Sequence, residues 1–285
     1  MDKEVEYGNF LTDDNKEIPY KKWIAKSSIA HANVIAIHGL GSYLENFNAL
    51  GEYFVEKGVN VFAIELRGFG RWKYSGKWSY HEFDSLVSDL NVFISKVQSD
   101  NNVDLPVFIL GDSLGCLISI LHMLGYPNKF KGAIFASPFF IKPPYKLITF
   151  PLFLLKYLVG DLQIRIVKNL SRLTKNQDFI AFDRELNLGA KSVSFELLYE
   201  VVKLSIKCEK QLKKNKISCP FFVAVGEKDV LVNWKNLSHI VKRLATLKQF
   251  KVYKEGHHLL LNDLPNSQVF KDMVDFIHSV LTETK

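Results

Sequence analysis

Short, uninterrupted runs of apolar residues alternate with helical patterns through the first half of the chain. The apolar runs cover residues 33–37, 59–64, 107–110 and 132–136. Each run has the length of a strand that is buried on both faces. Between them, apolar residues over 83–97 recur at steps of three and four, which places them on one face of a helix. This alternation predicts an α/β fold with a mostly parallel sheet flanked by helices.

The pattern changes after residue 137. No buried-strand pattern occurs over 138–217, where prolines and helical patterns dominate, and strand patterns return at 221–225 and 249–253. We therefore expect one α/β core, formed by residues 1–137 and 218–285, with a helical cap insertion at 138–217. Such an insertion would lie over the carboxyl ends of the strands, where ligands bind in open α/β sheets.

The strand predicted at 107–110 leads directly into the sequence GDSLG at residues 111–115, and a helical pattern follows. In a G-x-S-x-G turn the glycines let the strand and the helix pass closely, and the serine is exposed at the end of the sheet. The free N–H groups at the start of the helix face the same point. This arrangement predicts Ser113 as a nucleophile.

A serine hydroxyl reacts only when a base takes its proton and a third group orients that base. Asp229 follows the strand predicted at 221–225, and the histidine pair His257 and His258 follows the last strand. The chain order serine, carboxylate, histidine is that of the α/β hydrolases. We therefore predict Asp229 as the acid and one of the two histidines as the base.

A second turn, His38-Gly39-Leu40-Gly41, follows the strand at 33–37. It does not fit a dinucleotide-binding loop, because Leu44 stands where that motif needs a third glycine. The backbone N–H of Leu40 and that of Leu114 would together hold a developing oxyanion. We expect His38 to brace this loop through hydrogen bonds.

Five segments carry a family resemblance, namely HGLGSYLENF, ELRGFGRW, GDSLG, GEKDVLV and GHHLLLND. In this order they resemble the successive motifs of the monoacylglycerol lipase and lysophospholipase branch of the α/β hydrolases. Residues 173–198 resemble the cap of that branch more loosely. The resemblance implies the α/β-hydrolase fold and hydrolysis of an acyl ester through an acyl-enzyme, with no cofactor and no metal. It also implies the same nucleophile and acid, a base from the histidine pair, and an oxyanion hole formed by the Leu40 and Leu114 amides.

Two positions depart from the usual pattern of this family. Asp112 stands where a histidine is usual, and we expect it at the surface or behind the nucleophile. The spacing from Gly256 to the histidine pair is one residue shorter than usual. Alignment on the residues that follow, 260–263, favours His258 over His257 as the base.

The cap suggests the class of substrate. Large apolar residues crowd residues 139–158 more densely than one buried helix stripe requires, which predicts an apolar channel or a lid facing lipid. An acyl chain gains about 0.8 kcal/mol per buried CH₂, so such a surface selects medium or long chains. We predict monoacylglycerol or lysophospholipid as substrate. The alternatives are a short-chain carboxylesterase, thioesterase or peptidase on the same fold, or a non-catalytic binding protein.

The net charge of +7 raises nucleic acid or an anionic membrane as partners. Residues 142–217 contain 15 Lys and Arg against 7 Asp and Glu, so the excess lies in the apolar cap and the core is nearly neutral. This location disfavours nucleic acid and predicts peripheral contact between the cap and anionic lipid. The sequence does not indicate an oligomeric state.

Cysteine content and the amino-terminal segment indicate the compartment. The chain has 3 cysteines and no CxxC pair, which favours a reducing environment over a disulfide framework or a zinc site. The first ten residues have no apolar signal segment, and the longest apolar stretch, 147–160, is shorter than the ~20 residues of a spanning helix. We expect a cytoplasmic protein that contacts membranes peripherally.

Overall fold

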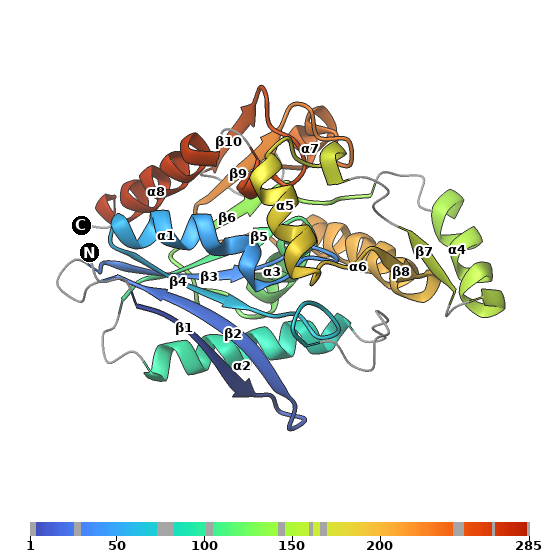
Figure 1. Cartoon of the computed structure of the whole chain (residues 1–285), viewed down its shortest axis with the longest axis horizontal. Coiled ribbons are helices and arrows are strands. Elements are labelled where there is room, and N and C mark those ends of the chain that lie inside the picture. Colours follow the sequence, from blue (N-terminus) through green and yellow to red (C-terminus); the bar gives the residue numbers. More distant parts are fainter. Residues whose placement is uncertain are drawn as a thin grey trace.

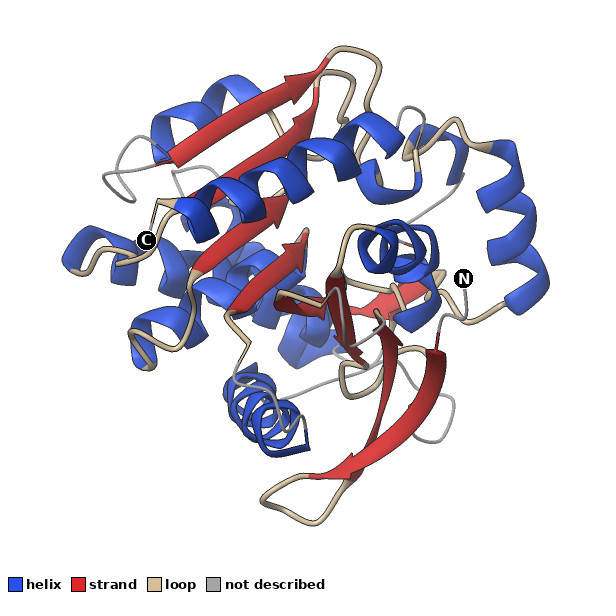
Figure 2. Cartoon of the chain, turned by 90° about the vertical axis from the view of Figure 1, so that its left-hand side faces the viewer, coloured by secondary structure: helices blue, strands red, loops and turns tan. Residues whose placement is uncertain are grey.

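The computed structural model describes residues 4–25, 30–72, 83–100, 105–141, 146–159, 162–165, 170–241, 248–263 and 266–283. Within these ranges an eight-stranded sheet crosses the molecule, with helices on both of its faces (Figure 2). The strands, in their order across the sheet, are β1 (Glu4–Leu11), β2 (Glu17–Ile24), β4 (Val59–Ile64), β3 (Ala32–Ile37), β5 (Val107–Asp112), β6 (Gly132–Ala136), β9 (Phe221–Gly226) and β10 (Lys248–Tyr253).

Six neighbouring strands of this sheet are parallel to one another, namely β4, β3, β5, β6, β9 and β10. The predicted mostly parallel sheet is therefore confirmed. The direction of winding reverses at β3, because β4 pairs with one side of it and β5 with the other. In a doubly wound sheet the crevice at such a reversal is where ligands bind. The loops that follow β3 and β5 therefore mark the expected site.

The antiparallel hairpin β1–β2 at the edge of the sheet is a feature that the sequence patterns did not predict. Its strands alternate charged and apolar residues, and Pro19 lies inside β2. They therefore lack the uninterrupted apolar run of a strand buried on both faces. β2 is also antiparallel to its neighbour β4.

Two apolar layers cover the sheet (Figure 1). One contains α2 (Phe83–Asp100), α3 (Leu114–Gly125), α6 (Phe195–Lys214) and α7 (Trp234–Val241), and the other contains α1 (Asn48–Glu56) and α8 (Asn266–Thr282). Side chains alternate between the layers along each strand; in β3, for example, Ile35 and Ile37 pack in the first layer and Val34 and Ala36 in the second. Burial on both faces explains why these strands are apolar throughout.

The segment between β6 and β9 contains α4 (Lys146–Val159), β7 (Gln163–Arg165), η2 (Leu170–Arg172), α5 (Gln177–Leu186), β8 (Ser192–Ser194) and α6. β7 and β8 form a small antiparallel sheet in a region where we expected helices alone, and strands of three residues are too short to give a readable pattern. Asn176 and Ser194 cap α5 and α6 by accepting hydrogen bonds from backbone N–H groups three residues later.

α6 packs on both the cap and the core. Its contacts include α4 on one side and the core helix α3 on the other, and its buried residues Leu197, Val201 and Leu204 belong to the same apolar layer as α3. The division of the chain into core and cap at 138–217 therefore stays an interpretation.

Gly115 allows α3 to begin directly against the end of β3, since a Cβ on this residue would lie 2.1 Å from the carbonyl oxygen of Ile37. We expect Gly115→Ala to lower the free energy of unfolding by about 1–3 kcal/mol, because the backbone must move apart. Gly125→Ala is the control in the same helix, since its Cβ would meet no atom within 4 Å. Thermal unfolding followed by circular dichroism should show a lower Tm only for Gly115→Ala. Equal Tm values would contradict this account.

Candidate active site

Ser113 lies in the tight turn between β5 and α3, beside the reversal in the sheet. Its backbone has φ 50° and ψ −108°, a conformation that residues other than glycine rarely adopt. The Ser113 N–H donates to the carbonyl of Ala136 on the neighbouring strand at 2.9 Å. A Cβ on Gly111 would lie 2.6 Å from the Cα of Cys116, which shows how closely the strand and the helix pass. The surrounding backbone thus holds the serine in a strained position.

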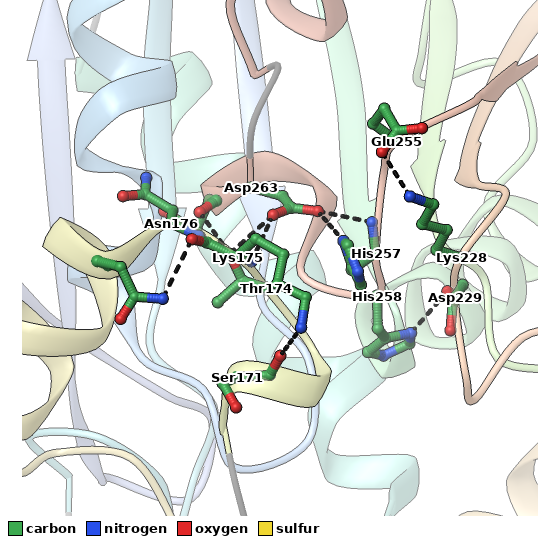
Figure 3. Close-up of polar contacts among 12 residues, drawn as sticks. Ser171, Thr174, Lys175, Asn176, Lys228, Asp229, Glu255, His257, His258 and Asp263 are labelled. Atoms are coloured by element: carbon green, nitrogen blue, oxygen red, sulfur yellow. Dashed lines mark hydrogen bonds and ion pairs between the residues drawn. The ribbon is translucent and has the colours of Figure 1, made fainter.

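Three side chains predicted from separate strand ends form a continuous chain of hydrogen bonds. His258 Nε2 lies 3.0 Å from Ser113 Oγ, and His258 Nδ1 lies 2.9 Å from Asp229 Oδ2. Because a carboxylate only accepts, Nδ1 carries the proton and Nε2 is free to accept from the serine hydroxyl. The second oxygen of Asp229 accepts from the backbone N–H groups of Leu231 and Val232, both at 2.8 Å. Figure 3 shows the His258 ring pointing toward the Asp229 carboxylate.

The surroundings of His258 make its ring a stronger base than a free imidazole. Burial disfavours its cation, but the hydrogen bond that it donates to Asp229 and the charges of Asp229 and Asp112 outweigh burial and raise the pKa of His258. The carboxyl group of Asp229 is fully buried, so its attraction to the ring is little screened by water. An imidazolium formed by proton transfer from Ser113 would therefore be stabilised.

His257 points away from Ser113 and contacts another carboxylate. Its Nδ1 lies 2.8 Å from Asp263 Oδ2, and its backbone N–H donates to the same oxygen at 2.6 Å. Asp263 also accepts hydrogen bonds from the cap, from Thr174 Oγ1 at 3.0 Å and the Lys175 N–H at 2.8 Å (Figure 3). The structure therefore brings His258, and not His257, to Ser113.

The loop that carries Leu40 lies directly against the serine. A Cβ on Gly39 would be 3.1 Å from the Cβ of Ser113, so the two backbones are in close contact. The Leu114 N–H belongs to the first turn of α3, where N–H groups have no partner within the helix. The structure thus brings the two segments that contain the predicted oxyanion-hole amides together beside Ser113.

Comparisons with known proteins agree with this geometry. The family described as Hydrolase_4 (serine aminopeptidase, S33) matches residues 28–265. The chain belongs to this family. Human monoglyceride lipase is 26% identical over 241 residues, which cover 82% of this chain and 77% of that protein. The Bacillus subtilis phospholipase YtpA is 25% identical over 258 residues, which cover 87% of this chain and 96% of that protein.

A solved structure extends the likeness to the fold. The crystal structure of a soluble variant of monoglyceride lipase from Saccharomyces cerevisiae, in complex with a substrate analog, has a TM-score of 0.80 at 20% sequence identity. The likeness covers 98% of this chain and 96% of that chain. The predicted α/β-hydrolase fold and the resemblance to the monoacylglycerol lipase branch are confirmed.

Two further residues with expected positions, His38 and Asp112, lie beside the active site of this hydrolase. His38 is fully buried, with Nδ1 2.9 Å from the Gly39 carbonyl and Nε2 accepting from the Leu66 N–H at 3.0 Å, so it joins two loops. Asp112 is not at the surface, which corrects that part of the expectation, because only 5% of the residue is exposed. One of its carboxylate oxygens has no hydrogen-bond partner among the described residues, and burial raises the pKa of Asp112 to about 6.

The described part of the chain shows no metal site and no membrane-spanning helix. It contains no group of three or more His, Cys, Asp or Glu side chains arranged to hold a metal ion. No helix within the described ranges is both long enough and apolar enough to cross a bilayer. Cys116, Cys208 and Cys219 are free thiols.

Asp263 anchors the loop that carries His258, a role that the sequence did not predict, since the residue served only to align the histidine pair with the family pattern. Its hydrogen bonds outweigh burial and lower the pKa of Asp263, so its stabilisation is present above the ordinary aspartate pKa and is lost as the pH falls below about 4. We expect Asp263→Asn to lower the free energy of unfolding at pH 7 by about 2 kcal/mol or more. Urea unfolding should show this difference shrinking toward pH 3.

Asp275→Asn is the control for this experiment, because Asp275 is exposed and its ion pair among the described residues is with Lys271 on the same helix. Such a surface pair contributes about 0–1 kcal/mol, so this variant should unfold nearly like wild type. If Asp263→Asn is as stable as Asp275→Asn at pH 7, the anchoring role of Asp263 is wrong.

Proposed function

We propose that this protein is a serine hydrolase that cleaves the acyl ester of monoacylglycerol or lysophospholipid through an acyl-enzyme. The observation that carries the proposal is the chain of hydrogen bonds from Ser113 through His258 to buried Asp229. The family assignment and the names of the relatives support an ester as substrate.

The proposed reaction begins when Ser113 Oγ attacks the ester carbonyl carbon while His258 Nε2 takes the hydroxyl proton. Asp229 stabilises the resulting imidazolium through Nδ1. The N–H groups of Leu40 and Leu114 donate to the tetrahedral oxyanion. His258 then gives its proton to the leaving alcohol, and the acyl group stays on Ser113. A water molecule, deprotonated by the same histidine, releases the fatty acid and restores the serine.

An apolar cavity of about 430 Å³ offers a place for the acyl chain. It lies where β6 and β9 end, between Phe139, Phe140 and Ile141 on one side and Leu231 and Val232 on the other. Burial of an acyl chain there stabilises binding by about 0.8 kcal/mol per CH₂, which favours longer chains. A short-chain carboxylesterase would not need this surface.

The cap also supports peripheral contact with a lipid surface, through α4. This helix lies at the right-hand edge of the molecule in Figure 1 and exposes large apolar side chains, with Leu147 73% and Leu158 77% exposed. The others of this kind on α4 are Phe150, Phe153, Leu154, Tyr157 and Val159. An apolar patch of this kind marks an interaction site, and an apolar helix face enters the boundary of a bilayer.

The positive charge of Lys156 on α4 is paired, whereas the apolar side chains of this helix are exposed. Lys156 on α4 forms ion pairs with Glu196 and Glu200 of α6, so it is partly neutralised. We therefore propose that apolar insertion of α4 drives the contact and that the basic excess of the cap strengthens binding to anionic lipid. The cytoplasmic location stays a prediction.

One prediction of the proposed function concerns the nucleophile and the base. A fluorophosphonate probe should label wild type but not Ser113→Ala. His258→Ala should lower kcat/KM on a monoacylglycerol on the order of 10⁴-fold, because the serine loses its base. His257→Ala is the matched control, since its ring contacts Asp263 and not Ser113, and it should still be labelled. Unchanged labelling of Ser113→Ala would refute the assignment.

The chemical class of substrate needs a separate panel with one fixed acyl chain. Rates on its glycerol ester, lysophosphatidylcholine, thioester and amide should be highest for the oxygen esters. A preference for the amide would instead support a peptidase, in line with the description of the matched family. A series of acyl lengths should show kcat/KM rising beyond acetate.

A further prediction of the proposed function concerns contact with the membrane. Leu154→Glu combined with Leu158→Glu should abolish co-sedimentation with phosphatidylcholine vesicles containing phosphatidylglycerol, since each charge opposes insertion of α4. Leu11→Glu, on the exposed edge strand β1, is the control and should bind like wild type. Binding should weaken on pure phosphatidylcholine vesicles. Equal binding of the α4 variant and wild type would exclude α4 as the contact.

A further inference from the structure

A second cavity, of about 330 Å³, lies between the Leu40 loop and the cap. Leu40, whose amide is a proposed oxyanion donor, and Leu259, which follows His258, form part of its wall. The cavity therefore lies beside the proposed oxyanion donor and next to the histidine that would return a proton to the departing alcohol.

Specific contacts between the cap and the core shape this cavity. Tyr43, on the loop after β3, donates a hydrogen bond to Asp183 Oδ1 of α5 at 2.9 Å. The Ala190 N–H donates to the Gly41 carbonyl at 2.8 Å. Nearby, the Leu259 N–H donates to the Leu173 carbonyl at 2.9 Å. The walls are thus joined by direct hydrogen bonds between the segments that form them.

The charged groups around this cavity are mostly cationic. Arg165 from β7, Arg184 from α5 and Lys191 line it. Asp183 is the one carboxylate among the described residues of its lining, and it already accepts a hydrogen bond from Tyr43. Neither arginine forms an ion pair with any residue in the described ranges, and Lys191 donates to the neutral side chain of Asn187. Two guanidinium groups therefore remain available to a ligand in the cavity.

The apolar cavity near Phe139 differs in charge. Its described lining includes Glu209 but no Lys or Arg. The structure thus has a largely apolar cavity at the ends of β6 and β9 and a basic one beside Leu40 and Leu259. An amphiphilic ester, with an acyl chain on one side of its carbonyl and a polar alcohol on the other, matches this difference in character.

We propose that the basic cavity binds a phosphate group carried by the alcohol portion of the substrate, so that the preferred substrates are anionic lysophospholipids such as lysophosphatidic acid. Guanidinium groups match phosphate because their N–H donors bind two of its oxygens at once. This inference rests on the proposed ester hydrolysis at Ser113. It narrows the substrate from glycerol esters in general to those with a phosphate on the glycerol.

The test compares lysophosphatidic acid with monoacylglycerol of the same acyl chain, under conditions where both are monomeric. Wild type should have the higher kcat/KM for lysophosphatidic acid. Arg165→Gln combined with Arg184→Gln should lower the ratio of the two kcat/KM values on the order of tenfold or more, since each lost charged hydrogen bond weakens binding about that much. Lys210→Gln combined with Lys214→Gln removes the same charge from the exposed end of α6, away from the cavity, and should leave the ratio unchanged.

Inhibitors distinguish the lipid headgroup from free phosphate. Glycerol 3-phosphate should inhibit wild type competitively and should inhibit the double arginine variant at least tenfold more weakly. Stronger inhibition by glycerol 3-phosphate than by inorganic phosphate identifies the headgroup as the ligand, whereas equal inhibition identifies the phosphate alone. A kcat/KM ratio that is the same in wild type and in the arginine variant overturns the inference, whatever the inhibitors do.

Failure of the proposed function gives a different result. If wild type hydrolyses none of these esters, ester hydrolysis at Ser113 is wrong. Calorimetric titration with glycerol 3-phosphate then tests phosphate binding in the cavity without any need for hydrolysis. Binding to wild type that is lost in the arginine variant supports a phosphate site. Hydrolysis of monoacylglycerol without any preference for the phosphate ester overturns only the inference.

Discussion

The close passage of β5 and α3 at Ser113 is the constraint on which the rest of this site depends. Gly111 and Gly115 leave room for the Cys116 backbone and for the carbonyl of Ile37, and Ser113 takes a left-handed conformation between them. The turn stands at the reversal in the sheet, so the loop after β3 packs directly on the serine. One backbone geometry therefore places the hydroxyl at the start of α3 and against the loop that contains Leu40.

The histidine loop is held by both the core and the cap. On the core side, Asp229 receives the His258 ring and two backbone N–H groups. On the cap side, Thr174 and Lys175 bond to Asp263, which in turn fixes His257. The cap is therefore more than a cover over the site, because its residues help to set the position of the base. Buried carboxylates serve both tasks, and each accepts hydrogen bonds from several donors.

The cap separates its apolar surface from its charge. α4 exposes apolar side chains, while its Lys156 is paired with two glutamates of α6. The arginines that line the cavity beside Leu40 have no ion-pair partner among the described residues. The net charge alone therefore describes this chain poorly, since its basic residues lie on different surfaces. In our proposals, contact with lipid belongs to α4 and binding of a headgroup belongs to this cavity.

The sequence by itself determined the parallel sheet, the GDSLG turn, and the order of serine, carboxylate and histidine, because these depend on local spacing and on burial on both faces. It did not predict the β1–β2 hairpin or the β7–β8 pair, whose strands lack an uninterrupted apolar run. Only the tertiary structure brought His258 to Ser113 across 145 positions of sequence and turned its neighbour His257 to Asp263. The two histidines are adjacent and so have nearly the same local sequence. They differ in the residues that they contact, and those residues lie elsewhere along the chain. The burial of Asp112 and the cavity beside Leu40 were likewise decided by packing, since both depend on where the cap and the loops meet.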